Sequence, residues 1–375
     1  MSEHKGRIRF MDAGRGVAAL LVLEHHVMVY FGERVSEVLG ASTGHVLQFV
    51  SSLNDAAVQF FFFLSGWAIY LALDQARGGG KVDWYIFAWH RCRRILPLYW
   101  IALFLSWTLF VPGGPPDEAG PLNLVGNLAF LQTPTVFSRG WFVPYAGNGP
   151  LWSLAYEAWY YAATPVLCLA VLSSANLKSK RAPGLLLGAL VVSIVALAIS
   201  QLVFFPLAIY AVFWPLWVAG FAFGASRGKL AEEGLLFLLS VAACVALYVL
   251  HSLVGSDTLR SLADGLAVVV LAVLAIMITS RIPNTGYVAA ISSRPVGVFV
   301  FLGSGSYALY VLHYPVLRWQ AAHGISGYTV LLSIVVLVVA TPFLERLVNR
   351  MVRRLPYPHA ARPQRAIPPS STTES

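Results

Sequence analysis

Long apolar segments alternate with short polar ones along most of the 375-residue chain. A helix of roughly 20 apolar residues crosses a hydrocarbon core of about 30 Å, and about ten segments approach that length. They are 11–31, 56–74, 95–112, 151–172, 184–204, 207–225, 235–252, 264–280, 296–317 and 327–347. The pattern predicts an all-α protein, a polytopic membrane bundle of about ten transmembrane helices. A membrane barrel is not indicated, since its strands would alternate over stretches of about ten residues.

A weaker apolar stretch, 121–137, is interrupted by Asn123, Asn127 and Pro134. We interpret it as an interfacial or re-entrant piece rather than as a span. Beyond the last span the chain is rich in Pro, Ser and Thr, which is typical of a disordered segment. The expected organisation is one membrane domain, residues 1–350, followed by a disordered cytoplasmic tail, residues 351–375.

Basic residues are distributed unevenly between the connecting segments. With the N-terminus placed in the cytoplasm, 21 of the 26 lysines and arginines fall in cytoplasmic segments and Arg15 falls within a span. The four that fall outside are Arg34, Arg139, Arg260 and Arg318. Cytoplasmic loops of membrane proteins carry an excess of Lys and Arg, so this bias predicts ten spans with both termini inside. An eleventh span at 121–137 would move every later connecting segment to the opposite side of the membrane, and the excess of Lys and Arg on the cytoplasmic side would be lost.

Composition excludes several classes of protein. Hydrophobic residues make up 58% of the chain and charged residues only 11%, which does not fit a soluble enzyme, a disordered protein or a fibrous one. The net charge of +9 is explained by cytoplasmic loops, so no nucleic-acid partner is expected. The three cysteines, Cys92, Cys168 and Cys244, are far apart and form neither a metal-binding spacing nor a disulfide framework.

The first apolar segment carries ionisable residues, which are costly inside a membrane and usually functional. Arg15 and His26 are 11 residues apart, so on a helix they share a face and lie about 16 Å apart along the axis. Asp12 lies one turn before Arg15 on nearly the same face. The alternative is an interfacial Asp12–Arg15 ion pair and a packing histidine. His25 points about 100° away from His26, so the two cannot chelate one ion, and no metal is expected.

Two later segments repeat this kind of pattern. Ser153, Glu157 and Tyr161 follow each other at intervals of four, on one helical face, and a carboxylate there can orient an imidazole, act as a base or line a polar pocket. Tyr310 and His313 lie on one face in the ninth segment. For these two, an interfacial aromatic belt with a helix-end histidine is the simpler interpretation of the residues alone.

Three arginines, Arg91, Arg93 and Arg94, directly precede the third segment. Such residues often do no more than set membrane topology. Guanidinium groups also bind phosphate in bidentate fashion, so the same cluster is a candidate phosphate clamp.

These blocks together resemble the membrane acyltransferase-3 family of bacterial O-acyltransferases. RFMDAGRGVAALLVLEHH (9–26) resembles the family's opening block, with Arg15 and His26 at its spacing. FFFLSGWAIY (61–70), RCRRILPLY (91–99), LWSLAYEAWYY (151–161) and GSYALYVLHYP (305–315) resemble four further blocks, in the same order. The chain departs from the family at Tyr156 and Ala158, and it lacks the usual proline after Glu345.

The resemblance implies transfer of an acyl group, usually acetyl, from cytoplasmic acyl-CoA to a hydroxyl of a glycan or glycolipid at the bacterial inner membrane. Membrane lipid is an expected partner, and a homo-oligomer or polysaccharide-synthesis machinery remain alternatives. The residues expected to be catalytic are His26, Glu157 and Asp12. Those expected to bind the donor are Arg15, Arg91, Arg94 and Tyr99. Those expected to bind the acceptor are Trp152, Ser153, Tyr161, Tyr310 and His313.

Two mechanisms fit these residues. Neutral His26 can act as a general base on the acceptor hydroxyl, with Glu157 or Asp12 holding a histidine tautomer. His26 can instead carry the acyl group covalently before transfer. Two other functions stay open on the residues alone: a proton-coupled transporter or flippase for a lipid-linked sugar, and a non-catalytic partner in polysaccharide export.

Overall fold

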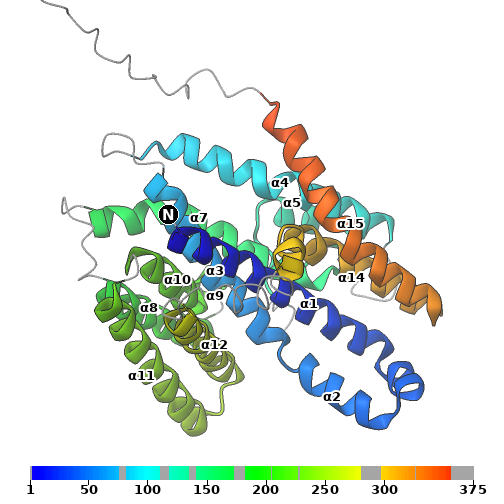
Figure 1. Cartoon of the computed structure of the whole chain (residues 1–375), viewed down its shortest axis with the longest axis horizontal. Coiled ribbons are helices and arrows are strands. Elements are labelled where there is room, and N and C mark those ends of the chain that lie inside the picture. The colour runs from blue at the N-terminus through cyan, green and yellow to red at the C-terminus, as the bar shows by residue number, and fades with distance from the viewer. Residues whose placement is uncertain are drawn as a thin grey trace, which may run out of the picture.

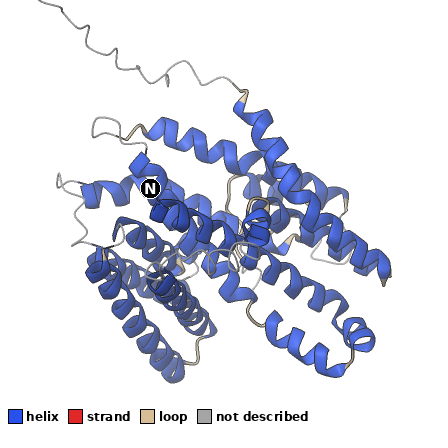
Figure 2. Cartoon of the chain, in the orientation of Figure 1, coloured by secondary structure: helices blue, strands red, loops and turns tan. Residues whose placement is uncertain are grey.

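The computed structural model describes residues 2–75, 82–109, 118–134, 141–172, 182–203, 205–226, 229–279, 297–325 and 327–355. Throughout these ranges the chain is helical or irregular, without a β-strand, which confirms the predicted all-α class (Figure 2). The α-helices are α1 (Ser2–Leu39), α2 (Ala41–Ser51), α3 (Asn54–Gln75), α4 (Trp84–Thr108), α5 (Pro121–Leu128), α7 (Trp152–Leu172), α8 (Ala182–Leu202), α9 (Pro206–Val212), α10 (Trp214–Ser226), α11 (Leu230–Val254), α12 (Asp257–Thr279), α14 (Ser306–Ala322) and α15 (Tyr328–Arg353). Two short 3-10 helices, η1 (Tyr145–Gly147) and η2 (Gly149–Leu151), precede α7.

Four helical stretches among the described residues are long and apolar enough to cross a membrane, or five if a bent pair counts as one span. They are Ala41–Leu73, Leu230–Val254, Asp257–Ile278 and Tyr328–Arg353, and the bent pair is Pro206–Val212 with Trp214–Ser226. The helices that carry the candidate chemistry, such as α1 and α4, fall short because their polar residues lower their hydropathy. Ten spans and two cytoplasmic termini therefore stay predictions.

The first helix is much longer than the span expected at 11–31. α1 has 38 residues, which gives it a length of about 57 Å, well above the thickness of a hydrocarbon core. It ends at Leu39, and the next residue, Gly40, has a positive φ of 86° that lets the chain reverse into α2. The α1–α2 hairpin extends away from the other helices in Figure 1.

The described part of the expected segment 121–137, which ends at residue 134, contains one short helix. α5 has eight residues and rises about 12 Å, too little to cross a bilayer. The side chains of Asn123 and Asn127 are buried and bond to backbone groups of the segment that follows. Residues 135–137 of the predicted piece lie outside the described ranges.

Two of the expected spans are broken. The segment 207–225 bends by 41° between α9 and α10. The segment 296–317 contains a helical stretch at 297–303, a turn at Ser304 and Gly305, and then α14. The last helix ends at Arg353 and so includes the first three residues of the predicted tail, and residues 356–375 lie outside the described ranges.

Close helix crossings hold the bundle together at glycines. A Cβ on Gly66 of α3 would lie 1.9 Å from the backbone oxygen of Trp217, and one on Gly220 of α10 would lie 1.9 Å from that of Phe63. A Cβ on Gly303 would lie 1.8 Å from the backbone oxygen of Asp12. The last crossing fixes the early part of α1 against the segment that leads into α14.

The helices form two groups with α1 and α3 between them (Figure 1). One group contains α8, α10, α11 and α12, and the other contains α4, α14 and α15. α3 packs on α10 and α12, whereas α1 packs on α14. Residues from both central helices therefore face the space between the groups, where the candidate site lies.

Candidate active site

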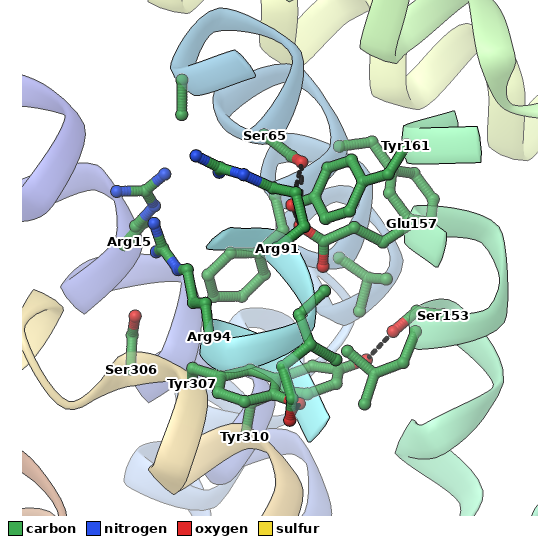
Figure 3. Close-up of a pocket in the computed structure, with 16 residues that line it drawn as sticks. Arg15, Ser65, Arg91, Arg94, Ser153, Glu157, Tyr161, Ser306, Tyr307 and Tyr310 are labelled. Atoms are coloured by element: carbon green, nitrogen blue, oxygen red, sulfur yellow. Dashed lines mark hydrogen bonds between the residues drawn. The ribbon is translucent and has the colours of Figure 1, made fainter. Parts of the chain in front are cut away.

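A cavity lined by arginines lies where α1, α3, α4, α7 and α14 meet (Figure 3). Arg15 enters it from α1, and Arg91 and Arg94 enter it from α4. We call this space the inner arginine cavity. Its volume is about 70 Å³, which is enough for a thin chain but not for a large head group. Its polar lining residues are Arg15, Ser65, Arg91, Arg94, Ser153, Glu157, Tyr161, Ser306, Tyr307 and Tyr310.

The carboxylate of Glu157 is held on one wall of this cavity. Ser65 Oγ donates a hydrogen bond to Glu157 Oε1 at 2.8 Å, and the Tyr161 hydroxyl donates to the same oxygen. The hydroxyl oxygens of Ser65 and Tyr161 are 3.1 Å apart. The guanidinium of Arg91 lies 5.9 Å from the centre of the Tyr161 ring. Figure 3 shows Arg91 beside Tyr161 and Glu157, and Arg15 and Arg94 farther across the space. The carboxylate thus offsets part of the charge of the three arginines.

Tyr310 links the inner arginine cavity to a second one. Its hydroxyl lies 2.7 Å from Ser153 Oγ and donates to the Pro150 carbonyl at 3.1 Å. Tyr310 and Val58 line both cavities. We call the second space the histidine cavity, because both His25 and His26 line it.

Two histidines from distant parts of the chain meet beside this second space. Nδ1 of His313 lies 2.9 Å from the Leu309 carbonyl, which can only accept, so this nitrogen carries the hydrogen and Nε2 carries the lone pair. That Nε2 lies 3.0 Å from Nδ1 of His26, which also lies 2.8 Å from the Val22 carbonyl. The Nδ1–H of neutral His26 is therefore shared between these two acceptors. Its lone pair is left on Nε2.

His25 is fixed in a similar way. Its Nδ1 lies 3.0 Å from the backbone oxygen of Ser51, the last residue of α2, and 2.9 Å from Ser51 Oγ. The contact ties the end of α2 to α1, and it leaves Nε2 as the ring nitrogen available to a ligand. The rings of His25 and Tyr314 both stand edge-on to the ring of His26, at centroid distances of 5.0 and 4.9 Å.

An irregular segment before α7 forms a wall of the histidine cavity, through Pro144, Gly149 and Pro150. Ala146 in this wall has a positive φ of 49°, a conformation that costs a non-glycine residue about 1–3 kcal/mol. Arg318 of α14 donates to the Ala146 carbonyl at 3.1 Å and pairs with Glu118 at 3.6 Å. These contacts hold the wall against α14.

A third cavity lies at the opposite end of the inner arginine cavity, and we call it the outer basic cavity. Arg15 and Arg94 line both spaces. The outer basic cavity is lined by Asp12, Arg15, His90, Arg93, Arg94, Gly303, Ser304, Glu345, Asn349, Val352 and Arg353. The three cavities thus follow one another along α1, from Asp12 to His26, and neighbouring cavities share lining residues.

The structure brings most of the predicted site residues together. The predicted residues that line the inner arginine cavity are Arg15, Arg91, Arg94, Ser153, Glu157, Tyr161 and Tyr310. Asp12, Tyr99 and Trp152 do not line it, and neither do His26 and His313. His26 and Trp152 line the histidine cavity, and His313 contacts His26. Among the described residues, no group of three His, Cys, Asp or Glu side chains is placed to hold a metal ion.

Asp12 and Glu157 are not placed to hold the tautomer of His26. Asp12 pairs with Arg15 at 3.5 Å, and it precedes His26 by 14 residues, or about 21 Å along α1. The hydrogen bonds of Glu157 run to Ser65 and Tyr161. The contacts on His26 Nδ1 come instead from the Val22 carbonyl and His313 Nε2, and neither residue was predicted to hold the tautomer of His26.

Tyr99 lies away from the three cavities. Its side chain is fully buried, and its hydroxyl donates to the Asn127 carbonyl at 2.9 Å and accepts from Gln132 at 3.1 Å. Its ring stacks on Phe130 at 4.7 Å. The observed contacts of Tyr99 are thus with the loop around α5, not with the arginines.

Several residues of the site were not singled out from the sequence. Ser65 was visible as a polar residue inside the apolar run FFFLSGW. Glu345 was visible as an acid in the last apolar segment, and its Oε2 accepts from the Ala308 backbone N–H at the start of α14. Tyr314 directly follows His313, but nothing in the pattern distinguishes it from the other interfacial aromatics.

Comparison with known proteins places the chain in a family. The model of the acyltransferase-3 family, an acyltransferase domain, matches residues 8–344. No curated protein and no solved structure is found to be similar. The match covers every element that contributes to the inner arginine and histidine cavities, and apolar helices long enough to span a membrane lie within it. The chain therefore belongs to the acyltransferase-3 family of membrane acyltransferases.

Proposed function

We propose that the protein is an O-acyltransferase of the bacterial inner membrane that moves an acyl group, acetyl in the first instance, from cytoplasmic acyl-CoA to a hydroxyl of a cell-surface or exported glycan. The observation that carries this proposal is the row of three cavities, which leads from a basic end to the lone pair of His26. A donor with a phosphate-rich head and a long thin arm matches both its charge and its shape.

The donor enters from the basic end. Positive-inside charge places this end in the cytoplasm, where acyl-CoA is available. Arg15 and Arg94, which line both the outer basic and the inner arginine cavity, bind phosphate oxygens, since guanidinium groups form paired hydrogen bonds with phosphate. Arg91 lines the inner cavity alone and adds its positive charge beside the start of the arm. Arg15 and His26 are about 16 Å apart along α1, a distance that the extended pantetheine arm can cover. The thioester then lies beside His26.

The chemical step uses the lone pair on Nε2 of His26. As a general base it takes the proton of the acceptor hydroxyl while the oxygen attacks the thioester carbonyl. The carbon–sulfur bond breaks, and the thiolate takes the proton back from the imidazolium. His313 Nε2 and the Val22 carbonyl accept the Nδ1–H throughout and stabilise the imidazolium. The same lone pair serves the covalent route, in which the acyl group passes through His26.

The acceptor occupies the histidine cavity from the other side of the membrane. Trp152 and Tyr314 line this space and offer ring faces and edges to a sugar. Tyr310 and Ser153 stand at the junction with the inner arginine cavity, where donor and acceptor meet. Tyr161 lies on the donor side, with Glu157, and we assign it to the arginine cavity rather than to the acceptor.

The test is acyl transfer from radiolabelled acetyl-CoA to total envelope glycan, in membranes that carry the wild type or His26→Ala at equal expression. Wild type should label the glycan, and His26→Ala should lower the rate about 10²–10⁴-fold, the usual contribution of a general base. His45→Ala, which alters an exposed histidine of α2, serves as the control and should keep the full rate. Equal rates for wild type and His26→Ala would refute the assigned role. Glycan export without acyl-CoA would favour a transporter.

A further inference from the structure

The outer basic cavity has the size for a ligand of its own. Its volume is about 340 Å³, nearly five times that of the inner arginine cavity. A bulky head group fits the outer space and cannot follow the arm into the inner one. Its charged residues come from α1 and α4, in the first third of the chain, and from α15, near the end of the described residues.

The two acidic side chains in this cavity are already engaged. Asp12 pairs with Arg15, and Glu345 Oε2 accepts from the Ala308 backbone N–H at 3.1 Å. The basic lining residues are more numerous: Arg15, Arg93, Arg94 and Arg353. Within the described ranges, the exposed guanidinium of Arg353 has no ion pair or hydrogen bond. The cavity is therefore positively charged overall, and Asn349 and Ser304 add neutral polar groups to its wall.

We propose that the outer basic cavity binds the phosphorylated nucleotide of the donor, with Arg353 of α15 and Arg94 of α4 pairing with its phosphates. This assignment rests on the proposed function. It makes α15 a determinant of donor class: a thioester of full coenzyme A is selected over one whose phosphopantetheine carries no nucleotide, as on an acyl carrier protein. Arg94 lies at the junction, where the head group passes into the arm.

The phosphate of an anionic lipid head group has the same chemistry and could reach this cavity. The two sources differ in one measurable respect. A nucleotide phosphate belongs to the donor, so losing its contact changes the affinity for some donors and not others. A lipid phosphate is independent of the donor, so losing its contact affects all donors alike.

The experiment compares three donors on the purified full-length protein in nanodiscs of zwitterionic lipid: acetyl-CoA, acetyl-dephospho-CoA and acetyl-phosphopantetheine. Arg353→Met removes the charge, and Arg350→Met is the matched control, since Arg350 lies exposed on the same helix and does not line the cavity. Arg353→Met should raise KM for acetyl-CoA by roughly tenfold to a hundredfold, the equivalent of about 1.5–3 kcal/mol for a charged hydrogen bond. KM for acetyl-phosphopantetheine and all values for Arg350→Met should be unchanged.

Binding of free CoA, measured by calorimetry on the same samples, tests the cavity without any acyl transfer. Weaker CoA binding by Arg353→Met together with an inactive wild type would support the nucleotide site and refute the proposed function. The inference is overturned if Arg353→Met changes KM equally for all three donors, or for none. It is also overturned if the effect of the substitution depends on added phosphatidylglycerol rather than on the donor.

Discussion

His26 owes its free Nε2 to two neighbours that lie four and 287 residues away in the chain, Val22 and His313. The first contact is local to α1 and would form in any helix with a histidine at this position. The second exists only because α14 packs along α1 and brings His313 to the same depth. A histidine with Nδ1 held as a donor presents a basic Nε2, which is the form that a general base requires.

Replacing His313 with phenylalanine should lower kcat by roughly tenfold to a hundredfold and leave KM for acetyl-CoA unchanged. The imidazolium formed during transfer loses one acceptor, and a hydrogen bond to a charged group is worth about 1.5–3 kcal/mol. Steady-state kinetics on matched protein would measure this. His313→Gln keeps an oxygen acceptor near the same place and should recover part of the rate. A rise in KM with constant kcat would instead place His313 in donor binding.

Helical spacing explains which site residues could be predicted. Ser153, Glu157 and Tyr161 share a face by their intervals of four, and all three line the inner arginine cavity. Arg91 and Arg94, three residues apart, also share a face and also line it. Tyr99 is five residues after Arg94, or about 140° around the helix, so its ring faces the loop around α5 instead.

At the scale of elements, hydropathy predicts where helices lie but not where they break. The described part of each of the ten expected spans is largely helical, yet the breaks at Phe213 and at Ser304–Gly305 have no strong hydropathy signal. The contact between Glu345 and the start of α14 shows why: the break near Gly305 is stabilised by a side chain from α15. The hydropathy pattern of a segment cannot reveal that the start of its helix is capped by a side chain from another helix.

The crossing of α3 and α10 should be among the least tolerant positions in the bundle. Gly66→Ala places a methyl group against the backbone oxygen of Trp217, which no rotamer change can move away. Overpacking of this kind costs about 1–3 kcal/mol and sometimes more. Thermal unfolding in detergent, followed by tryptophan fluorescence, should show a midpoint several degrees below that of the wild type.

Gly188→Ala is the control for this substitution, because a Cβ at Gly188 of α8 meets nothing within 4 Å. It should leave the midpoint unchanged or raise it slightly, since alanine favours a helix more than glycine does. Equal midpoints for Gly66→Ala and Gly188→Ala would show that the two helices are not in backbone contact.

At the scale of the whole molecule, the three cavities connect regions that face opposite sides of the proposed membrane. The uneven distribution of Lys and Arg between the connecting segments predicts the orientation of the chain in the membrane. The spacing of Arg15 and His26 predicts that their side chains lie on one face of α1. The path through the three cavities required the tertiary structure, because its walls come from α1, α3, α4, α7, α14 and α15. The central claim is that donor and acceptor reach His26 from opposite sides.

The most direct test of that claim supplies labelled acetyl-CoA, which does not cross a membrane, to one face of sealed vesicles at a time. Inside-out vesicles expose the cytoplasmic face, and they should transfer label to glycan that stays inside and is protected from an added deacetylase. Right-side-out vesicles should transfer none until they are made permeable. Transfer of equal rate in both orientations, or label on glycan at the same face as the donor, would contradict the account.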